Sequence, residues 1–176
     1  MSEKIETLID SGKVEQRIRE VAAQINEDYQ DSMLHLICVL KGGVYVMTEL
    51  SKHLTIPVTM DFMSVSSYGD DTKSSGVVRI LKDLDQPLEG KDVLIVEDII
   101  DSGRSMHYLL KILKSRGPES LKLCSLLNKP DRRVTEVEID YTGFDIPDEF
   151  VVGYGLDYAQ KYRNLPYIGT VVLEEK

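Results

Sequence analysis

Cysteine is scarce in this chain: only Cys38 and Cys124 occur among its 176 residues, and both lie within apolar, strand-like segments. Small secreted domains that depend on disulfides carry more cysteine than this, so buried, reduced thiols are the better interpretation. The chain also lacks any apolar stretch of membrane-spanning length, and its first residues lack the basic and apolar regions of a signal peptide. The sequence therefore predicts a cytoplasmic protein with no membrane association.

Two common nucleotide-binding motifs are also absent. The chain contains neither GxxxxGK followed by Ser or Thr nor GxGxxG, so a P-loop and a dinucleotide-binding turn have no basis in the sequence. Basic residues are outnumbered, with 21 Lys and Arg against 30 Asp and Glu, and the net charge of −9 argues against nucleic acid as a partner. An acidic protein that binds an anionic substrate needs local hydrogen-bond donors and a divalent cation.

The composition is that of an ordinary globular protein, with 42% hydrophobic and 29% charged residues in a length typical of one domain. Apolar periodicity predicts helices over 14–29, capped near Ser11-Gly12, over 44–54, and from the end of segment 93–105 to about Arg116. Strand patterns occur at 33–40, 58–65, 77–82, 93–96, 121–127, 134–141, 149–154 and 170–173. Strands that alternate with helices imply parallel pairing. We therefore expect a single α/β domain over residues 1–176, with a twisted parallel sheet flanked by helices.

Residues 58–82 are expected to form a flap on this domain. The loop between its two strands, residues 66–76, is polar and long for a hairpin turn. Long loops of this kind in compact domains are usually lids or binding loops. We therefore expect a flexible lid at about 66–76.

Segment 93–105 runs from an apolar strand into an acidic turn that opens a helix. Glu97, Asp98 and Asp101 place three carboxylates within five residues at the carboxyl end of the strand, where open α/β sheets bind ligands. A helix N-terminus is a ready cradle for phosphate, but neighbouring carboxylates repel phosphate. They must therefore serve another part of the same ligand, such as sugar hydroxyls or a metal, and a phosphorylated sugar is the natural candidate.

This segment closely resembles the phosphoribosyl-pyrophosphate (PRPP) signature of the type I phosphoribosyltransferases. The resemblance implies that Glu97 and Asp98 hold the ribose hydroxyls and that the loop Asp101–Ser105 wraps the 5′-phosphate. Ser102 and Ser105 stand where threonine is common in that family, and Arg104 occupies a variable position. The PRPP-binding residues implied in this way are Glu97, Asp98, Asp101, Ser102, Gly103, Arg104 and Ser105.

A second turn, Leu40-Lys41-Gly42-Gly43, closes the first buried strand. Its glycines permit close approach of the backbone to a ligand, and its lysine supplies a cation. It resembles the pyrophosphate loop of purine phosphoribosyltransferases, in which the peptide bond that matches Leu40–Lys41 is typically cis. The same resemblance assigns Arg163 to pyrophosphate, and it matches Ser67 and Tyr68 to the pair on the lid that closes over the reacting centre.

The stretch 144–158 is similar, nearly residue for residue, to the purine-binding stretch of the hypoxanthine–guanine phosphoribosyltransferases. The resemblance implies that Phe150 stacks on the purine and that the backbone of Val151 reads the base edge. It also implies that Lys129 hydrogen-bonds the 6-oxo group of the purine. An ammonium group can only donate a hydrogen bond, so it favours a 6-oxo acceptor over a 6-amino donor. A purine-binding hood is expected mainly from about 128–176. Packing in the core is the alternative for Phe150.

The resemblance also implies a magnesium ion. Asp157 would hold Mg²⁺ through carboxylate oxygen, the ligand this cation prefers, and Glu97 and Asp98 are further candidates for metal contact. Asp101 is the implied proton acceptor for the attacking purine. The implied reaction transfers 5-phosphoribose from PRPP to hypoxanthine or guanine, giving IMP or GMP and pyrophosphate. A homodimer or homotetramer is expected by the same resemblance.

Two alternatives stay open from the residues. One is an enzyme of the same class that prefers xanthine, because nothing near Asp157 settles how the 2-position of the purine is read. The other is a non-catalytic regulator that keeps the PRPP fold as a sensor. The acidic net charge and the presence of Asp101, Lys129 and Phe150 speak against a regulator that binds nucleic acid. The three histidines fit none of the implied sites.

Overall fold

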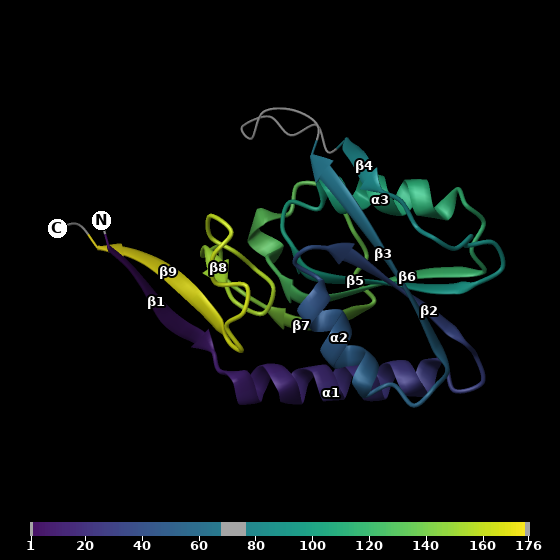
Figure 1. Ribbon diagram of the computed structural model, residues 1–176, viewed down its shortest axis with the longest axis horizontal. Coiled ribbons are helices and arrows are strands. Elements are labelled where there is room, and N and C mark those ends of the chain that lie inside the picture. The colour runs from purple at the N-terminus through teal and green to yellow at the C-terminus, as the bar shows by residue number, and fades with distance from the viewer. Residues whose placement is uncertain (1, 68–76, 175–176) are drawn as a thin grey trace.

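The computed structural model describes residues 2–67 and 77–174 of the chain, and Figure 1 gives its architecture. A six-stranded main sheet has, in spatial order, β4 (Val78–Lys82), β3 (Val58–Ser67), β2 (Leu34–Leu40), β5 (Asp92–Ile100), β6 (Ser120–Asn128) and β7 (Tyr141–Asp145). All neighbouring strands pair in parallel except β3 and β4. The expected α/β fold with a mostly parallel sheet is confirmed.

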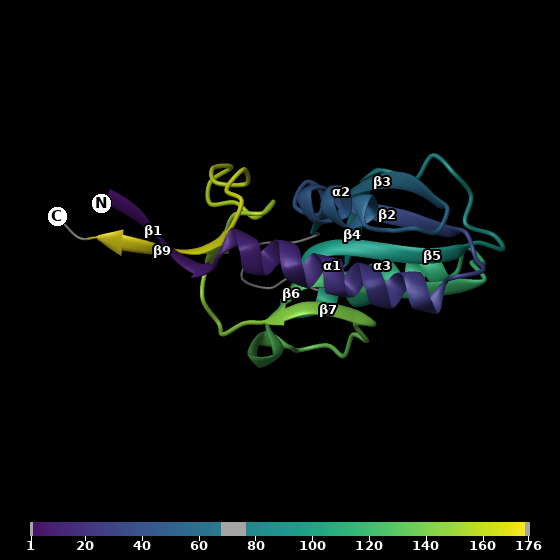
Figure 2. The same cartoon turned by 90° about the horizontal axis from the view of Figure 1, so that it is seen from below.

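Helices cover both faces of this sheet, which explains why its central strands are continuous apolar runs. Leu36 of β2 packs in one core with α1 (Ser11–Asp28) and α2 (Val44–Lys52), whereas its neighbour Ile37 packs in a second core with α3 (Arg104–Lys114). Figures 1 and 2 show α1 and α2 on one side of the sheet and α3 on the other. Successive strand residues thus face opposite helical layers.

The strand order places a topological switch point between β2 and β5. The chain passes from β2 through α2 to β3 on one side, and from β5 through α3 to β6 on the other. Loops that leave adjacent strands in opposite directions open a crevice at their carboxyl ends. The two turns singled out in the sequence, 40–43 and 97–103, both lie at this crevice.

A separate three-stranded antiparallel sheet consists of β1 (Ser2–Ile9), β9 (Ile168–Glu174) and β8 (Val151–Val152), in the order β1-β9-β8. Ser2 lies opposite Glu174, so the two ends of the described chain lie side by side, as Figure 1 shows. We call this sheet the hood. Its first strand, β1, is not among the elements that the sequence predicts.

Several expected elements differ from the structure. The strand expected over 134–141 is wrong, because the strand in this region is β7, Tyr141–Asp145. The strand expected over 149–154 is reduced to Val151–Val152. The first half of the expected flap, β3, is an integral strand of the main sheet, since it pairs with β2 from Val58 to Ser64. The cap of α1 is Asp10, which accepts a hydrogen bond from the N–H of Lys13 at 2.9 Å.

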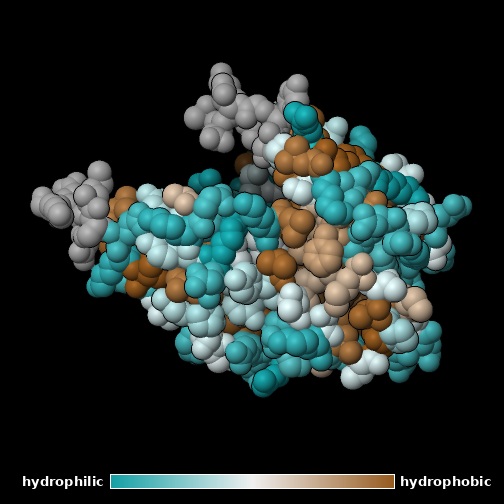
Figure 3. All heavy atoms as spheres, viewed as in Figure 1, coloured by the Kyte–Doolittle hydropathy of each residue, from teal (hydrophilic) through white to brown (hydrophobic). Residues whose placement is uncertain are grey.

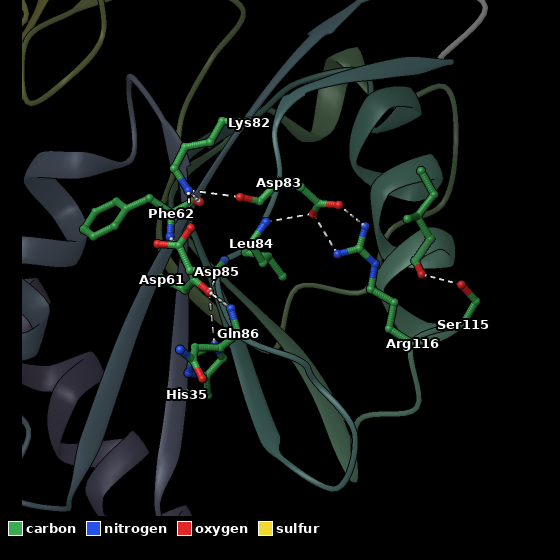
Figure 4. Close-up of polar contacts among 11 residues, drawn as sticks. His35, Asp61, Phe62, Lys82, Asp83, Leu84, Asp85, Gln86, Ser115 and Arg116 are labelled. Atoms are coloured by element: carbon green, nitrogen blue, oxygen red, sulfur yellow. Dashed lines mark hydrogen bonds and ion pairs between the residues drawn. The ribbon is translucent and has the colours of Figure 1, made fainter.

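The loop that follows β4 is fixed by buried and paired charges, drawn in Figure 4. The carboxylate of Asp61 is 2% exposed and accepts the backbone N–H groups of Asp85 and Gln86, both at 2.9 Å. The carboxylate of Asp83 receives two hydrogen bonds from Arg116, at 2.7 and 2.9 Å. This loop leads into β5, so these contacts help to fix where the strand that carries the acidic turn begins.

The surface carries mixed polarity. Figure 3 shows apolar atoms gathered near the middle of one face, in the region of β3 and α2. Met60 on β3 is 46% exposed and Tyr45 on α2 is 39% exposed. Among the residues that the structure describes, no helix has the length and apolar character to cross a membrane.

Candidate active site

The residues of the PRPP signature line one concavity at the carboxyl end of β5. Its volume is about 180 Å³, and it is lined by Glu97, Ile99, Ile100, Asp101, Ser102, Gly103, Ser105 and Met106. Helix α3 begins at Arg104, so its first turn borders this concavity, and the N-terminus of a helix is a favourable place for a phosphate group. Of the seven residues implied in PRPP binding, five line the concavity directly.

Gly103 is required by the backbone at this turn. Its φ is +83°, and a Cβ atom at this position would lie 2.4 Å from the carbonyl oxygen of Thr135. That carbonyl belongs to the irregular segment after β6, which also donates hydrogen bonds from Val134 and Thr135 to the carbonyl of Ser102, at 2.9 and 3.1 Å. The loop 101–105 is therefore supported by residues 133–137.

Glu97 and Asp98 form a pair of carboxyl groups, of which Glu97 is buried and Asp98 is half-buried. Burial raises the pKa of Glu97 well above its usual range, and the neighbouring Asp98 raises it further. Burial also raises the pKa of Asp98, although hydrogen bonds from Glu97 and from the N–H of Ile99 oppose the shift. Two adjacent carboxyl groups resist ionising together, so the pair favours a shared proton until hydroxyl donors or a cation approach.

The turn 40–43 lies directly against this acid pair. The Leu40–Lys41 peptide bond is cis, as the resemblance implied. A Cβ atom on Gly42 would lie 1.8 Å from Oδ2 of Asp98, and one on Gly155 would lie 1.9 Å from the carbonyl oxygen of Gly42. Only glycine allows these close approaches, which bring the ends of β2 and β5 together with the loop that follows β8.

The residues expected at pyrophosphate and metal form a polar cluster beside that turn. Nζ of Lys41 donates to Oε1 of Gln160 at 3.2 Å, and Nη2 of Arg163 donates to the same oxygen at 3.2 Å. Arg163 also pairs with Oδ1 of Asp157 at 3.0 Å, and its Nη1 donates to the carbonyl of Gly155 at 2.7 Å. Gln160 thus joins the two cations. Sequence reasoning missed it because it lies outside every motif.

Lys129 and Phe150, the two side chains expected at the purine, differ in exposure. Lys129 is 7% exposed, and its Nζ lies 3.9 Å from Oδ1 of Asp148. Phe150 is 57% exposed, with its ring 5.6 Å from that of Tyr158 in an edge-on arrangement. The core-packing alternative for Phe150 is therefore wrong. Val151 is buried in β8 and pairs with Thr170.

Asp101 follows the acid pair along the chain and begins the loop 101–105, and two arginines contact it. Nε of Arg132 is 3.3 Å from Oδ1 of Asp101, and Nη1 of Arg132 is 3.5 Å from Oδ2 of Asp148. Nε of Arg133 donates to the backbone carbonyl of Asp101 at 3.2 Å, and its Nη2 donates to Oδ1 of Asn128. Sequence reasoning missed both arginines, because they follow the lysine motif without belonging to it.

Some of the residues singled out in the sequence are not part of this site as the structure describes it. Tyr68 and most of the expected lid, residues 68–76, are outside the described residues, and for Ser67 only the backbone, at the end of β3, is described. The histidines lie apart from the concavity: His35 contacts Thr59, His53 contacts Glu49, and His107 contacts the carbonyl of Glu136.

The acidic residues can be tested for their fit to a magnesium ion. Within residues 2–67 and 77–174, no three Asp, Glu, His or Cys side chains gather as a complete ligand set. Magnesium, however, is commonly held by one or two carboxylates together with substrate phosphates. The pair Glu97 and Asp98 suits that arrangement, since a cation would relieve the cost of ionising both groups.

The chain is similar to known proteins along most of its length. A family model described as "Phosphoribosyl transferase domain" matches residues 4–159. The chain belongs to the phosphoribosyltransferase family. A hypoxanthine-guanine phosphoribosyltransferase from Mycobacterium avium is 51% identical over 93% of this chain and 84% of that protein. A hypoxanthine phosphoribosyltransferase from Salmonella typhimurium is 49% identical over 98% of both chains.

The phosphoribosyltransferase fold extends over the whole described chain. The crystal structure of a hypoxanthine-guanine phosphoribosyltransferase from Bacillus anthracis superimposes with a TM-score of 0.93 at 44% identity, covering 98% of this chain and all of that one. Similarity at this level places the chain with the hypoxanthine–guanine phosphoribosyltransferases within the family.

Proposed function

We propose that this protein is a purine-salvage enzyme that transfers 5-phosphoribose from PRPP to hypoxanthine or guanine, releasing pyrophosphate and giving IMP or GMP. The observation that carries the proposal is the junction at the carboxyl ends of β2 and β5. There the acid pair Glu97 and Asp98, a glycine turn with a cation and a concavity of about 180 Å³ meet in one crevice. A buried lysine and an exposed phenylalanine of the same site suit a 6-oxopurine.

PRPP is bound along this crevice. Glu97 and Asp98 accept hydrogen bonds from the ribose hydroxyls, which are donors that a buried carboxylate needs. The amides of the turn 102–105, with Ser102 and Ser105, hold the 5′-phosphate at the start of α3. Lys41, the turn backbone and Arg163 face the pyrophosphate, and Ser67 and Tyr68 belong to the lid that closes over it.

The purine lies between the hood and the main sheet. The ring of Phe150 stacks on the base, and the backbone of Val151 reads its edge. Lys129 donates to the 6-oxo group. Because a lysine ammonium cannot accept a hydrogen bond, adenine with its 6-amino donor is disfavoured.

The reaction is a displacement at C1 of the ribose through an oxocarbenium-like centre, as in glycosyl transfer. Lys41 and Arg163 stabilise negative charge as pyrophosphate departs. Asp101 accepts the proton that the purine loses. Lid closure excludes water, which otherwise competes with the purine for C1.

Glu97, Asp98 and Asp157 are the residues that would hold Mg²⁺, which supplies charge neutralisation for the pyrophosphate when bound. Addition of excess EDTA is therefore expected to abolish turnover, and addition of excess Mg²⁺ to restore it. Undiminished turnover in EDTA would remove the metal from the proposal while leaving the other residues untouched.

The function is tested by measuring pyrophosphate release from PRPP with hypoxanthine, guanine, xanthine and adenine in turn. We expect efficient release with the first two purines and background release with adenine. A higher kcat/KM for xanthine than for hypoxanthine would support the xanthine-preferring alternative. No release with any of the four purines would contradict the proposal.

We also propose a homodimer or homotetramer in a cytoplasmic setting. Support for assembly comes from the apolar atoms on the face of β3 and α2 in Figure 3, since exposed apolar patches commonly mark interfaces. Support for the compartment comes from Cys38 and Cys124, which are buried and unbonded, as in proteins of reducing environments. Sedimentation equilibrium measures the first point directly, and a monomer at micromolar concentration would refute it.

A further inference from the structure

Arg132 joins two parts of the site that the proposed reaction uses separately. Its guanidinium lies within 3.3 Å of the Asp101 carboxylate and within 3.5 Å of the Asp148 carboxylate. Asp148 in turn lies 3.9 Å from the ammonium of Lys129. Four groups of alternating charge therefore form a chain from the proposed proton acceptor to the lysine that reads the 6-oxo group.

The local fold explains why one segment supplies both ends of this chain. The short 3-10 helix η1, Pro130–Arg132, begins directly after Lys129, and the N–H of Arg132 donates to the carbonyl of Lys129 at 3.1 Å. In this type of turn the side chains at positions i and i+3 lie over one another. Lys129 and Arg132 therefore face the same side, where Asp148 lies between them.

The contact with Asp101 leaves that carboxylate able to react. Its Oδ1 is buried and accepts no hydrogen bond from the described residues, although the guanidinium of Arg132 is within ion-pair distance. The Asp101 side chain as a whole is 47% exposed, so the rest of the carboxylate can meet a substrate proton while Arg132 holds Oδ1. The 6-oxo group and the adjacent ring nitrogen of a purine share one edge, so a fixed spacing between Lys129 and Asp101 suits that edge.

We propose that Arg132 is a positioning residue that orients the Asp101 carboxylate toward the purine and couples it, through Asp148, to the purine pocket. This inference rests on the proposed function, in which Asp101 accepts the proton. Arg133 differs from Arg132, because it donates to the backbone carbonyls of Asp101 and Val137 and to the side chain of Asn128. The two adjacent arginines thus provide an internal contrast between orienting the carboxylate and supporting the loop.

The test compares steady-state kinetics of the parent with Arg132→Gln, Arg132→Lys and Arg133→Gln. Arg132→Gln is expected to lower kcat with hypoxanthine roughly tenfold while leaving KM for PRPP unchanged, because a misdirected group slows chemistry without weakening phosphate binding. Arg132→Lys retains the charge and should recover part of that loss. Arg133→Gln should instead raise KM for PRPP. Arg19→Gln, on the exposed face of α1, is the control with parental kinetics.

A double-mutant cycle decides whether Arg132 acts through Asp101. If it does, Arg132→Gln should have little further effect on kcat in the background of Asp101→Asn. Equal losses in both backgrounds would overturn the inference, as would parental kcat in Arg132→Gln itself. Thermal unfolding of each variant separates these outcomes from loss of folded protein. An inactive parent would contradict the proposed function instead, so the two failures are distinguishable.

Discussion

At the scale of single residues, burial decides what a charged side chain can do. Lys129 is 7% exposed although it follows a strand end, where a lysine is usually solvated. A buried ammonium needs a partner, and Asp148 at 3.9 Å supplies only part of that need. A purine oxygen would supply the rest, so the cost of burying Lys129 is recovered only when a hydrogen-bond acceptor binds.

Replacement of Lys129 by glutamine tests this interpretation. A glutamine amide can both donate and accept, so Lys129→Gln should lose kcat/KM with hypoxanthine while its discrimination against adenine weakens. Sites built around one polar partner discriminate strongly, because the wrong ligand leaves buried groups unpaired. The measurement is kcat/KM for hypoxanthine and adenine in parent and variant. Unchanged hypoxanthine turnover in Lys129→Gln would show that the purine is read elsewhere.

At the scale of elements, the loop 101–105 packs against Thr135, a residue far from it in the chain. Gly103 combines a left-handed φ of +83° with a backbone oxygen that would lie 2.4 Å from any Cβ. Gly90 offers a matched control, since its φ is +71° but nothing lies within 4 Å of its Cβ position. A larger residue at either position would have a strained backbone, but only at Gly103 would its Cβ atom also clash with a neighbour.

Gly90→Ala is therefore expected to cost about 1–2 kcal/mol of unfolding free energy with unchanged kinetics. Gly103→Ala should show a similar or larger loss and, in addition, raise KM for PRPP roughly tenfold or more, because the loop must shift away from Thr135. Urea unfolding and PRPP titration of initial rates measure the two effects. Equal KM values for PRPP in the two variants would argue against a phosphate role for the turn.

Some strands could be predicted from the sequence and others could not. β2 and β5 are predicted because a strand covered on both faces must be apolar throughout. The strand expected at 134–141 fails because Val137 packs into the α3 core from an irregular segment, so its apolar character reflects burial without pairing. β1 is missed because alternation in an edge strand at a chain end is a weak signal, and its partner β9 lies more than 150 residues away in the pairing.

The candidate site, like the fold, could be predicted from the sequence only in part. The motifs predict which turns meet, because carboxyl ends of neighbouring parallel strands share one edge of the sheet. The motifs do not predict the contacts of Arg132, Asp148 or Gln160. These contacts join side chains from different segments, and no regular spacing along the chain signals them. Sequence patterns carry information on backbone proximity, whereas contacts that bridge loops depend on the folded structure.

At the scale of the whole molecule, acid is expected to destabilise the fold through two buried residues, His35 and Asp61, which are drawn in Figure 4. Burial lowers the pKa of His35, with a contribution from Lys91, while Asp61 opposes the shift. For Asp61, burial raises the pKa, but hydrogen bonds from three backbone N–H groups outweigh it and the net pKa is lowered. Neutral His35 and ionised Asp61 are therefore the native forms.

The sign of the pH effect follows from linkage. Each folded-state pKa is below its unfolded value, so the stability contribution is intact above that unfolded value and is lost as the pH falls toward the folded one. We expect unfolding free energy to fall as pH decreases below about 6.5 for His35, and again below about 3.9 for Asp61. Urea midpoints between pH 8 and 3 measure both losses, with His35→Asn as the comparison for the first one. The parent and variant should converge in acid, and parallel curves would exclude His35 as the cause.

The pairing of β1 with β9 has a consequence for how the molecule is made. Domains generally fold as units during synthesis, and in this domain the main sheet from β2 to β7 is complete in sequence before β9 emerges. β1, although translated first, has no partner in the hood until then. The crevice at the ends of β2 and β5 therefore has its strands available before β9 emerges, whereas β1 and β8 gain their shared partner only with β9, so completion of the hood is expected to be the last step.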